Sequence, residues 1–157
     1  MEEQNNRPFV GKPVKTKYMW RDVERRAAQF GIPFKGVLPY PITPSTLPHR
    51  VGLVASREGW CPRFTQAAYR GWFLEHKELG QSKHLAEAIA SLGRNPQAVL
   101  AEAEAPQIQA ILTSETDEAR RLGIFGSPTF VIDEEIFWRD DRLEIALDWW
   151  KNKSGKT

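Results

Sequence analysis

The chain has 157 residues, of which 41% are hydrophobic and 27% are charged, and this balance is that of a globular domain rather than of a disordered chain. Its formal net charge of +2 excludes the strongly basic surface that is typical of nucleic-acid-binding proteins. No apolar run reaches the roughly 20 residues that span a bilayer, the N-terminus does not resemble a signal peptide, and the lone Cys61 excludes internal disulfides; all three favour a cytoplasmic protein.

The first two thirds of the chain are predicted to be helical. Apolar residues recur at helical spacing, and glycines that stop helices follow most of these stretches. At one junction, Asn95 stands before Pro96, an N-cap followed by proline at the first helical position. A connector with five prolines between Pro33 and Pro48 is predicted to be extended. The predicted helices cover residues 16–31, 48–59, 61–80, 83–93 (opened by Ser82), 97–105 and 106–123.

Strands are predicted only near the C-terminus. Residues 128–132 and 135–138 are short apolar runs separated by Asp133 and Glu134, a spacing that indicates a hairpin. A last helix follows, with Asp140 or Asp141 as its predicted N-cap. Because a lone two-stranded ribbon is marginal in water and leaves open edges, the sheet is expected to lack strands or to borrow them.

Two motifs carry a resemblance to a known family. The stretch GIFGSPTFVIDEEIFWRDDRLE at residues 123–144, with KYMWRDVERRAAQFGIP at 17–33, resembles the 2-hydroxychromene-2-carboxylate isomerases. These are glutathione-dependent proteins of the DsbA-like and kappa-class glutathione transferase group. The resemblance runs from about Arg7 to Trp150.

The resemblance implies a mostly helical α/β protein, in which a thioredoxin-like fold is interrupted by an all-helical insertion. It divides the chain into a lead-in (1–13), a helical insertion domain (14–122), the C-terminal part of the thioredoxin-like domain (123–151) and a tail (152–157). In the family a βαβ unit with the catalytic serine comes first. This sequence begins after that unit, so the resemblance implies an N-terminally truncated fold with an incomplete sheet, and it places no catalytic residue in this chain.

The function that the resemblance implies is the reversible isomerisation of 2-hydroxychromene-2-carboxylate to trans-o-hydroxybenzylidenepyruvate, a step of aromatic degradation. Glutathione is the expected cofactor and a small aromatic carboxylate the expected substrate, with no nucleic-acid or membrane partner. Activity is expected to be weak or absent in this truncated form. One alternative is a non-catalytic glutathione-binding or protein-interaction module, whose open sheet edge pairs with another subunit, as in a homodimer. Another is a relative of the kappa-class glutathione transferases or of the DsbA-like oxidoreductases.

Ser127 and Pro128 are the first candidate ligand-binding residues. From the residues alone, a plain turn before an edge strand is an alternative interpretation. In the family the matching peptide bond is cis, and the backbone of the residue before proline pairs with the cysteinyl part of glutathione. The resemblance therefore assigns Ser127–Pro128 to glutathione binding.

Asp140 and Asp141 are the second pair of candidates. N-capping explains them without a ligand. The resemblance instead assigns the Asp140 backbone to the carboxylate of the γ-glutamyl group and the Asp141 side chain to its ammonium. Arg139 stands where the family usually has glycine. It could crowd the ligand or need a changed φ, or its guanidinium could contact a carboxylate.

The upstream signature contributes Lys17, which is the preferred candidate there for a contact with glutathione or substrate. A structural Arg–Asp pair in the same signature, linking the two halves, is the alternative interpretation. The three histidines are scattered and no paired metal-ligand spacing occurs, so no metal site is predicted. Cys61 has no partner cysteine, and an inert thiol is favoured over a redox centre.

Overall fold

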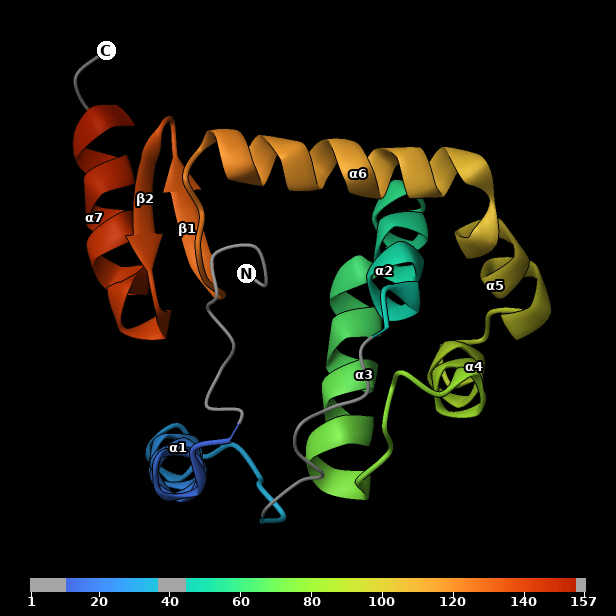
Figure 1. Ribbon diagram of the computed structural model, residues 1–157, viewed down its shortest axis with the longest axis horizontal. Helices are drawn as coiled ribbons and strands as arrows, with labels where there is room; N and C mark the ends of the chain where they lie inside the picture. Colours follow the sequence, from blue (N-terminus) through green and yellow to red (C-terminus); the bar gives the residue numbers. More distant parts are fainter. Residues whose placement is uncertain (1–10, 37–44, 155–157) are drawn as a thin grey trace. The chain divides into compact units, whose positions relative to one another are not determined.

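The computed structural model describes residues 11–36 and 45–154 (Figure 1). The described residues up to Thr113 form one compact unit, which we call the helical unit, and those from Ser114 onward form a second, the hairpin unit. None of the described helices is long and apolar enough to cross a membrane.

The helical unit contains α1 and a group of short helices. All six predicted helices are present, at Pro13–Gln29 (α1), Leu47–Arg57 (α2), Cys61–Glu75 (α3), Ser82–Ala90 (α4), Pro96–Glu104 (α5) and Pro106–Arg121 (α6). The division between the two units falls within α6. The prediction of a mostly helical chain is therefore confirmed for the described residues.

The ends of the helices agree less well with the predictions. The predicted cap at Asn95 is confirmed, because its side chain accepts hydrogen bonds from the Gln97 and Ala98 backbone N–H groups at 3.0 and 3.2 Å. The extension of α3 to residue 80 is wrong. The helix ends at Glu75 because His76 adopts a left-handed backbone with φ 54°, and Lys77 N–H then donates to the Gly71 carbonyl at 3.0 Å.

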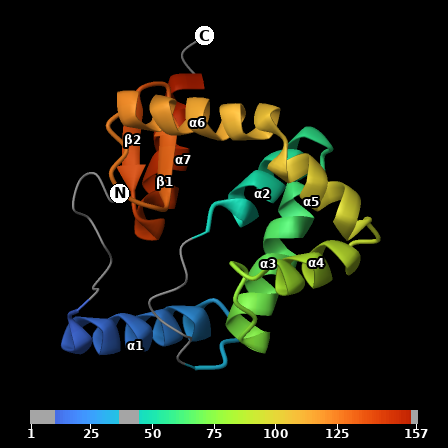
Figure 2. The same cartoon turned by 45° about the vertical axis from the view of Figure 1, so that its right-hand side comes forward.

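The core of the helical unit lies where α2, α3, α4 and α5 come together (Figure 2). Helices α2 and α4 each pack against both α3 and α5, so the four helices enclose the core between them. The spacing that predicted the helices also selects this core, since apolar residues three and four apart share one helix face. Its largest fully buried side chains are Val51, Val54, Leu85, Ile89 and Ile108.

The hairpin unit is built on two antiparallel strands, Thr129–Ile132 (β1) and Glu135–Trp138 (β2), which pair from Thr129 with Trp138 to Ile132 with Glu135. Both turn residues are held by ion pairs. Lys153 contacts Asp133 at 2.8 Å, and Arg121 contacts Glu134 at 3.3 Å. The predicted hairpin and its turn are confirmed.

Helix α7 (Leu143–Ser154) packs against both strands and buries Ala146. The centroid of the Trp149 ring lies 6.2 Å from that of the Phe137 ring, so this tryptophan contacts the sheet. The other apolar side chains of α7 are largely exposed: Leu143, Ile145, Leu147 and Trp150 keep between 43 and 55% of their surface in solvent. Among the described residues, two strands and one helix thus leave apolar surface uncovered.

Candidate functional site

The segment between α6 and β1 is shaped by two glycines. Gly123 has φ 72°, a left-handed conformation that ends α6, and Ile124 N–H donates back to the Ala119 carbonyl at 2.9 Å. Gly126 is buried under the indole of Trp138, and a β-carbon at this position would lie 2.3 Å from the indole nitrogen. The two glycines therefore set where the loop leaves the helix and how closely it approaches β2.

Ser127 and Pro128 follow at the exposed head of β1, and the peptide bond between them is cis, as the resemblance implied. The Pro128 carbonyl accepts a hydrogen bond from the Arg139 N–H at 2.9 Å, which joins this loop to the segment after β2. The Ser127 backbone makes no hydrogen bond with any residue that the structure describes. Its N–H and C=O groups are therefore available to an extended peptide.

Asp140 and Asp141 lie in a short 3₁₀ helix, Asp140–Arg142 (η1), that leads into α7. The prediction that one of them is the N-cap is not confirmed, because Arg139 occupies the N-cap position of η1 and its side chain makes no capping hydrogen bond. The Asp141 carboxylate faces two guanidinium groups, with Arg142 at 3.3 Å and Arg139 at 3.7 Å. Two carboxylates flanked by two guanidinium groups therefore follow directly after β2.

Arg139 itself has φ 86° and ψ 157°. This backbone region is strongly disfavoured for any residue with a β-carbon and is populated almost entirely by glycine. The changed φ that the sequence raised as one consequence of this arginine is therefore present. Its guanidinium is exposed and lies 3.7 Å from the Asp141 carboxylate, so it is accessible to a ligand.

Lys17 lies on α1 in the helical unit and is exposed, whereas the other four predicted site residues belong to the hairpin unit. The neighbouring charges of the upstream signature pair within α1 itself: Arg21 with Glu24, and Arg25 with Asp22. Of the five predicted site residues, the structure thus brings together Ser127, Pro128, Asp140 and Asp141 in one unit. Among the described residues, no cluster of three or more side chains could ligate a metal ion.

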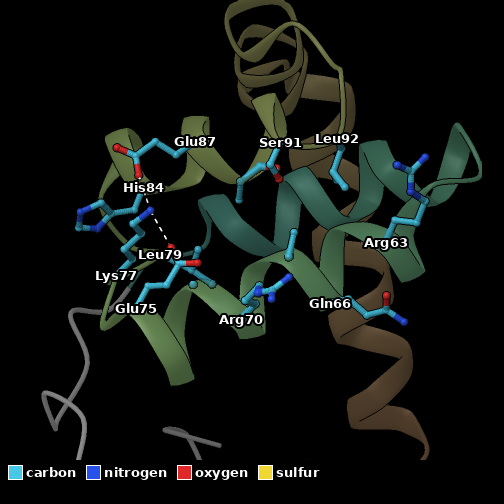
Figure 3. A pocket seen from close by; sticks show the side chains of 13 residues that line it. Arg63, Gln66, Arg70, Glu75, Lys77, Leu79, His84, Glu87, Ser91 and Leu92 are labelled. Atoms are coloured by element: carbon cyan, nitrogen blue, oxygen red, sulfur yellow. Dashed lines mark hydrogen bonds and ion pairs between the residues drawn. The ribbon is translucent and has the colours of Figure 1, made fainter. Parts of the chain in front are cut away.

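The helical unit also contains a hollow that was not predicted from the sequence (Figure 3). It lies between α3 and α4 and has a volume of about 570 Å³. At one end Lys77 bridges Glu75 and Glu87, at 2.7 and 2.9 Å. The two hydrogen bonds from Lys77 hold the pKa of each carboxyl group below its ordinary value. The same two hydrogen bonds raise the pKa of Lys77.

This bridge predicts a pH-dependent contribution to stability. A lowered carboxyl pKa stabilises the fold above the unfolded value of 4.5 and ceases to do so as the pH falls through the folded pKa values. The raised pKa of Lys77 stabilises the fold below 10.5 and ceases to do so as the pH rises through its folded pKa. The bridge thus contributes between these limits.

We expect Lys77→Met to lower the free energy of unfolding more at neutral pH than in acid, because the difference disappears as the pH falls through the lowered pKa values of Glu75 and Glu87. Urea denaturation at the two pH values measures the difference. Lys15→Met, a change at an exposed position of α1, serves as the control and should show no such pH dependence. A difference between wild type and Lys77→Met that persists in acid would contradict an electrostatic origin.

Comparisons with known proteins agree with the fold described above. A family model described as a DSBA-like thioredoxin domain matches residues 1–148. The 2-hydroxychromene-2-carboxylate isomerase of Sphingobium xenophagum is 27% identical over 135 residues, which cover 83% of this chain and 66% of the relative. The chain therefore spans just under two thirds of the length of this curated relative. A solved structure of a 2-hydroxychromene-2-carboxylate isomerase has a TM-score of 0.78 at 20% identity and covers 92% of this chain and 70% of that chain.

Proposed function

The chain belongs to the DsbA-like thioredoxin-domain family, and from this premise we propose that it binds glutathione in the service of a 2-hydroxychromene-2-carboxylate isomerase reaction. The relative of that name and the structural likeness support the reaction class. The observation that carries the binding proposal is the exposed Ser127 backbone, which no described residue engages. It lies at the head of β1, in the same unit as the charged Asp141 segment.

The proposed role of Ser127 is to pair with the tripeptide as a short strand would. Its N–H would donate to, and its C=O accept from, the cysteinyl backbone of glutathione. Pro128 itself cannot donate, and its carbonyl is already bonded to the Arg139 N–H. Ser127, rather than Pro128, can therefore offer both a backbone N–H and a backbone C=O to the ligand.

The proposed role of the segment after β2 is to hold the γ-glutamyl end, which carries one ammonium and one carboxylate. The Asp141 carboxylate suits the ammonium, because its two oxygens have more acceptor positions than the two neighbouring arginines occupy. The Arg139 guanidinium, which contacts Asp141 loosely at 3.7 Å, suits the carboxylate, as does the Asp140 backbone. The zwitterionic γ-glutamyl end would thus contact a group of opposite charge at both its ammonium and its carboxylate. Lys17 stays a candidate for a substrate or glutathione carboxylate.

Bound glutathione would supply a thiolate that adds reversibly to the substrate, so that the ring opens and a carbon–carbon bond rotates without net consumption of the cofactor. What this chain contributes in the proposal is orientation. Two separate contacts, at Ser127 and at Asp141, fix both the middle and one end of the tripeptide and so restrict where its sulfur lies.

Isothermal titration with glutathione tests the proposal. We expect Asp141→Asn to bind about tenfold more weakly than wild type, because it replaces a charge-assisted contact by a neutral one. Asp148→Asn is the matched control: it removes the same charge from an exposed position on α7, and its affinity should match that of wild type. Absence of heat at millimolar glutathione, or equal weakening by both variants, would exclude this binding mode.

The exposed apolar side chains of α7 favour a second candidate, a non-catalytic module that contacts another protein through this surface. Absorbance assays with the chromene carboxylate separate the two candidates. Turnover that requires added glutathione supports the isomerase. Glutathione binding without turnover, together with association with another protein molecule that is lost when Leu147 of α7 is replaced by a polar residue, supports the module.

A further inference from the structure

We propose that the hollow between α3 and α4 binds a small organic anion, a carboxylate or a phosphate monoester with a compact apolar body. This inference is independent of the glutathione proposal, because every residue that lines the hollow belongs to the helical unit. Its volume of about 570 Å³ falls in the range of small-molecule sites.

One wall of the hollow presents two arginines from the same face of α3 (Figure 3). Arg63 and Arg70 are seven residues apart, which is close to two full turns, so their side chains leave the helix in nearly the same direction. Gln66, between them in the sequence, also lines the hollow and adds an amide donor. The wall is therefore rich in N–H groups that can bind oxyanions.

The two arginines are uncommitted. Neither forms an ion pair or a hydrogen bond with any residue that the structure describes, and Arg70 affects Glu75 only as one of the smaller electrostatic contributions to its lowered pKa. Arg63 also lies in the first turn of α3, where the helix dipole disfavours a cation. Both side chains are exposed, so their guanidinium groups are accessible to a ligand that enters from solvent.

The opposite end of the hollow carries one net negative charge. Lys77 there pairs with both Glu75 and Glu87, so each carboxylate already has a cationic partner. The lining as a whole holds three cations and two carboxylates, a formal charge of +1, and its positive end lies at Arg63 and Arg70. A cationic ligand is disfavoured and an anionic ligand favoured.

The lining between the charged groups is apolar and small. Ala67 and Gly71 of α3, Ala88 of α4 and Leu92, just after α4, leave room for a hydrocarbon body. The Ser91 hydroxyl donates to the Ala88 carbonyl at 2.7 Å and can still accept a hydrogen bond. A ligand with one oxyanion and a small hydrocarbon ring or chain therefore matches the hollow, because the oxyanion can contact the arginines and the hydrocarbon part can contact the apolar lining.

Titrations followed by NMR, with phenyl phosphate and benzoate as probes, test the proposal. We expect both probes to shift amide signals of α3 and α4, and Arg63→Gln and Arg70→Gln each to weaken binding by about five- to tenfold. Lys83→Gln is the matched control, because it removes the same charge from an exposed position on α4 that does not line the hollow. It should change the affinity by less than about twofold.

Either ranking of the two probes supports the site and identifies the preferred anion. No saturable shift at millimolar probe would overturn the proposal, as would equal weakening by Lys83→Gln, since that would indicate a general charge effect. A glutathione titration of Arg70→Gln separates the two proposals, because its affinity for glutathione should equal that of wild type. Loss of probe binding with unchanged glutathione binding assigns the hollow its own ligand.

Discussion

Leu85→Ala is expected to lower the free energy of unfolding by about 2–5 kcal/mol. Leu85 is fully buried in the core of the helical unit, where side chains from α2 to α6 meet. Truncation removes its transfer free energy and leaves a cavity, since close-packed helices collapse only in part around a lost side chain. Urea denaturation followed by circular dichroism measures the loss.

Leu53→Ala provides the matched control for this prediction. Leu53 packs against the same core but is only half-buried, so its truncation removes less buried surface and leaves less of an enclosed cavity. We expect a clearly smaller loss than for Leu85→Ala. Equal losses for the two variants would show that the core does not close tightly around α4.

The helices could be predicted from the sequence because their signals are local. Asn95 before Pro96 marks a helix start with its own side chain, and the structure contains the corresponding hydrogen bonds. The end of α3 could not be predicted in this way. His76 adopts a left-handed backbone that glycine would have signalled, and nothing in the residue type marks it.

The candidate glutathione site was predictable to the extent that it is local. The loop at Ser127 and the charged segment at Asp141 flank one hairpin, so the two-residue turn between its strands sets how they align. Lys17 lies far away in the sequence, and local patterns carry no information about its neighbours. The hollow between α3 and α4 was missed because arginines seven residues apart also occur on ordinary solvated helix faces.

Arg139→Gly is expected to stabilise the protein, by up to about 2.5 kcal/mol. The backbone of Arg139, at φ 86° and ψ 157°, costs a residue with a β-carbon about 1–3 kcal/mol. Glycine relieves this strain but loses more conformational freedom on folding, which offsets about 0.5–1 kcal/mol of the gain. The hydrogen bond from the residue 139 N–H to the Pro128 carbonyl is a backbone contact and survives the change.

The same variant is expected to bind glutathione about fivefold more weakly, because in our proposal the Arg139 guanidinium contacts a ligand carboxylate. Arg139→Ala separates the two effects. It removes the guanidinium but keeps the β-carbon, so it should lose affinity without the gain in stability. Urea denaturation and glutathione titration of both variants test this. Tighter binding by Arg139→Gly would show that the arginine crowds the ligand, in which case the strained residue would oppose binding as well as folding. Weaker binding with higher stability would show that this chain tolerates backbone strain in order to place a charge beside Asp141.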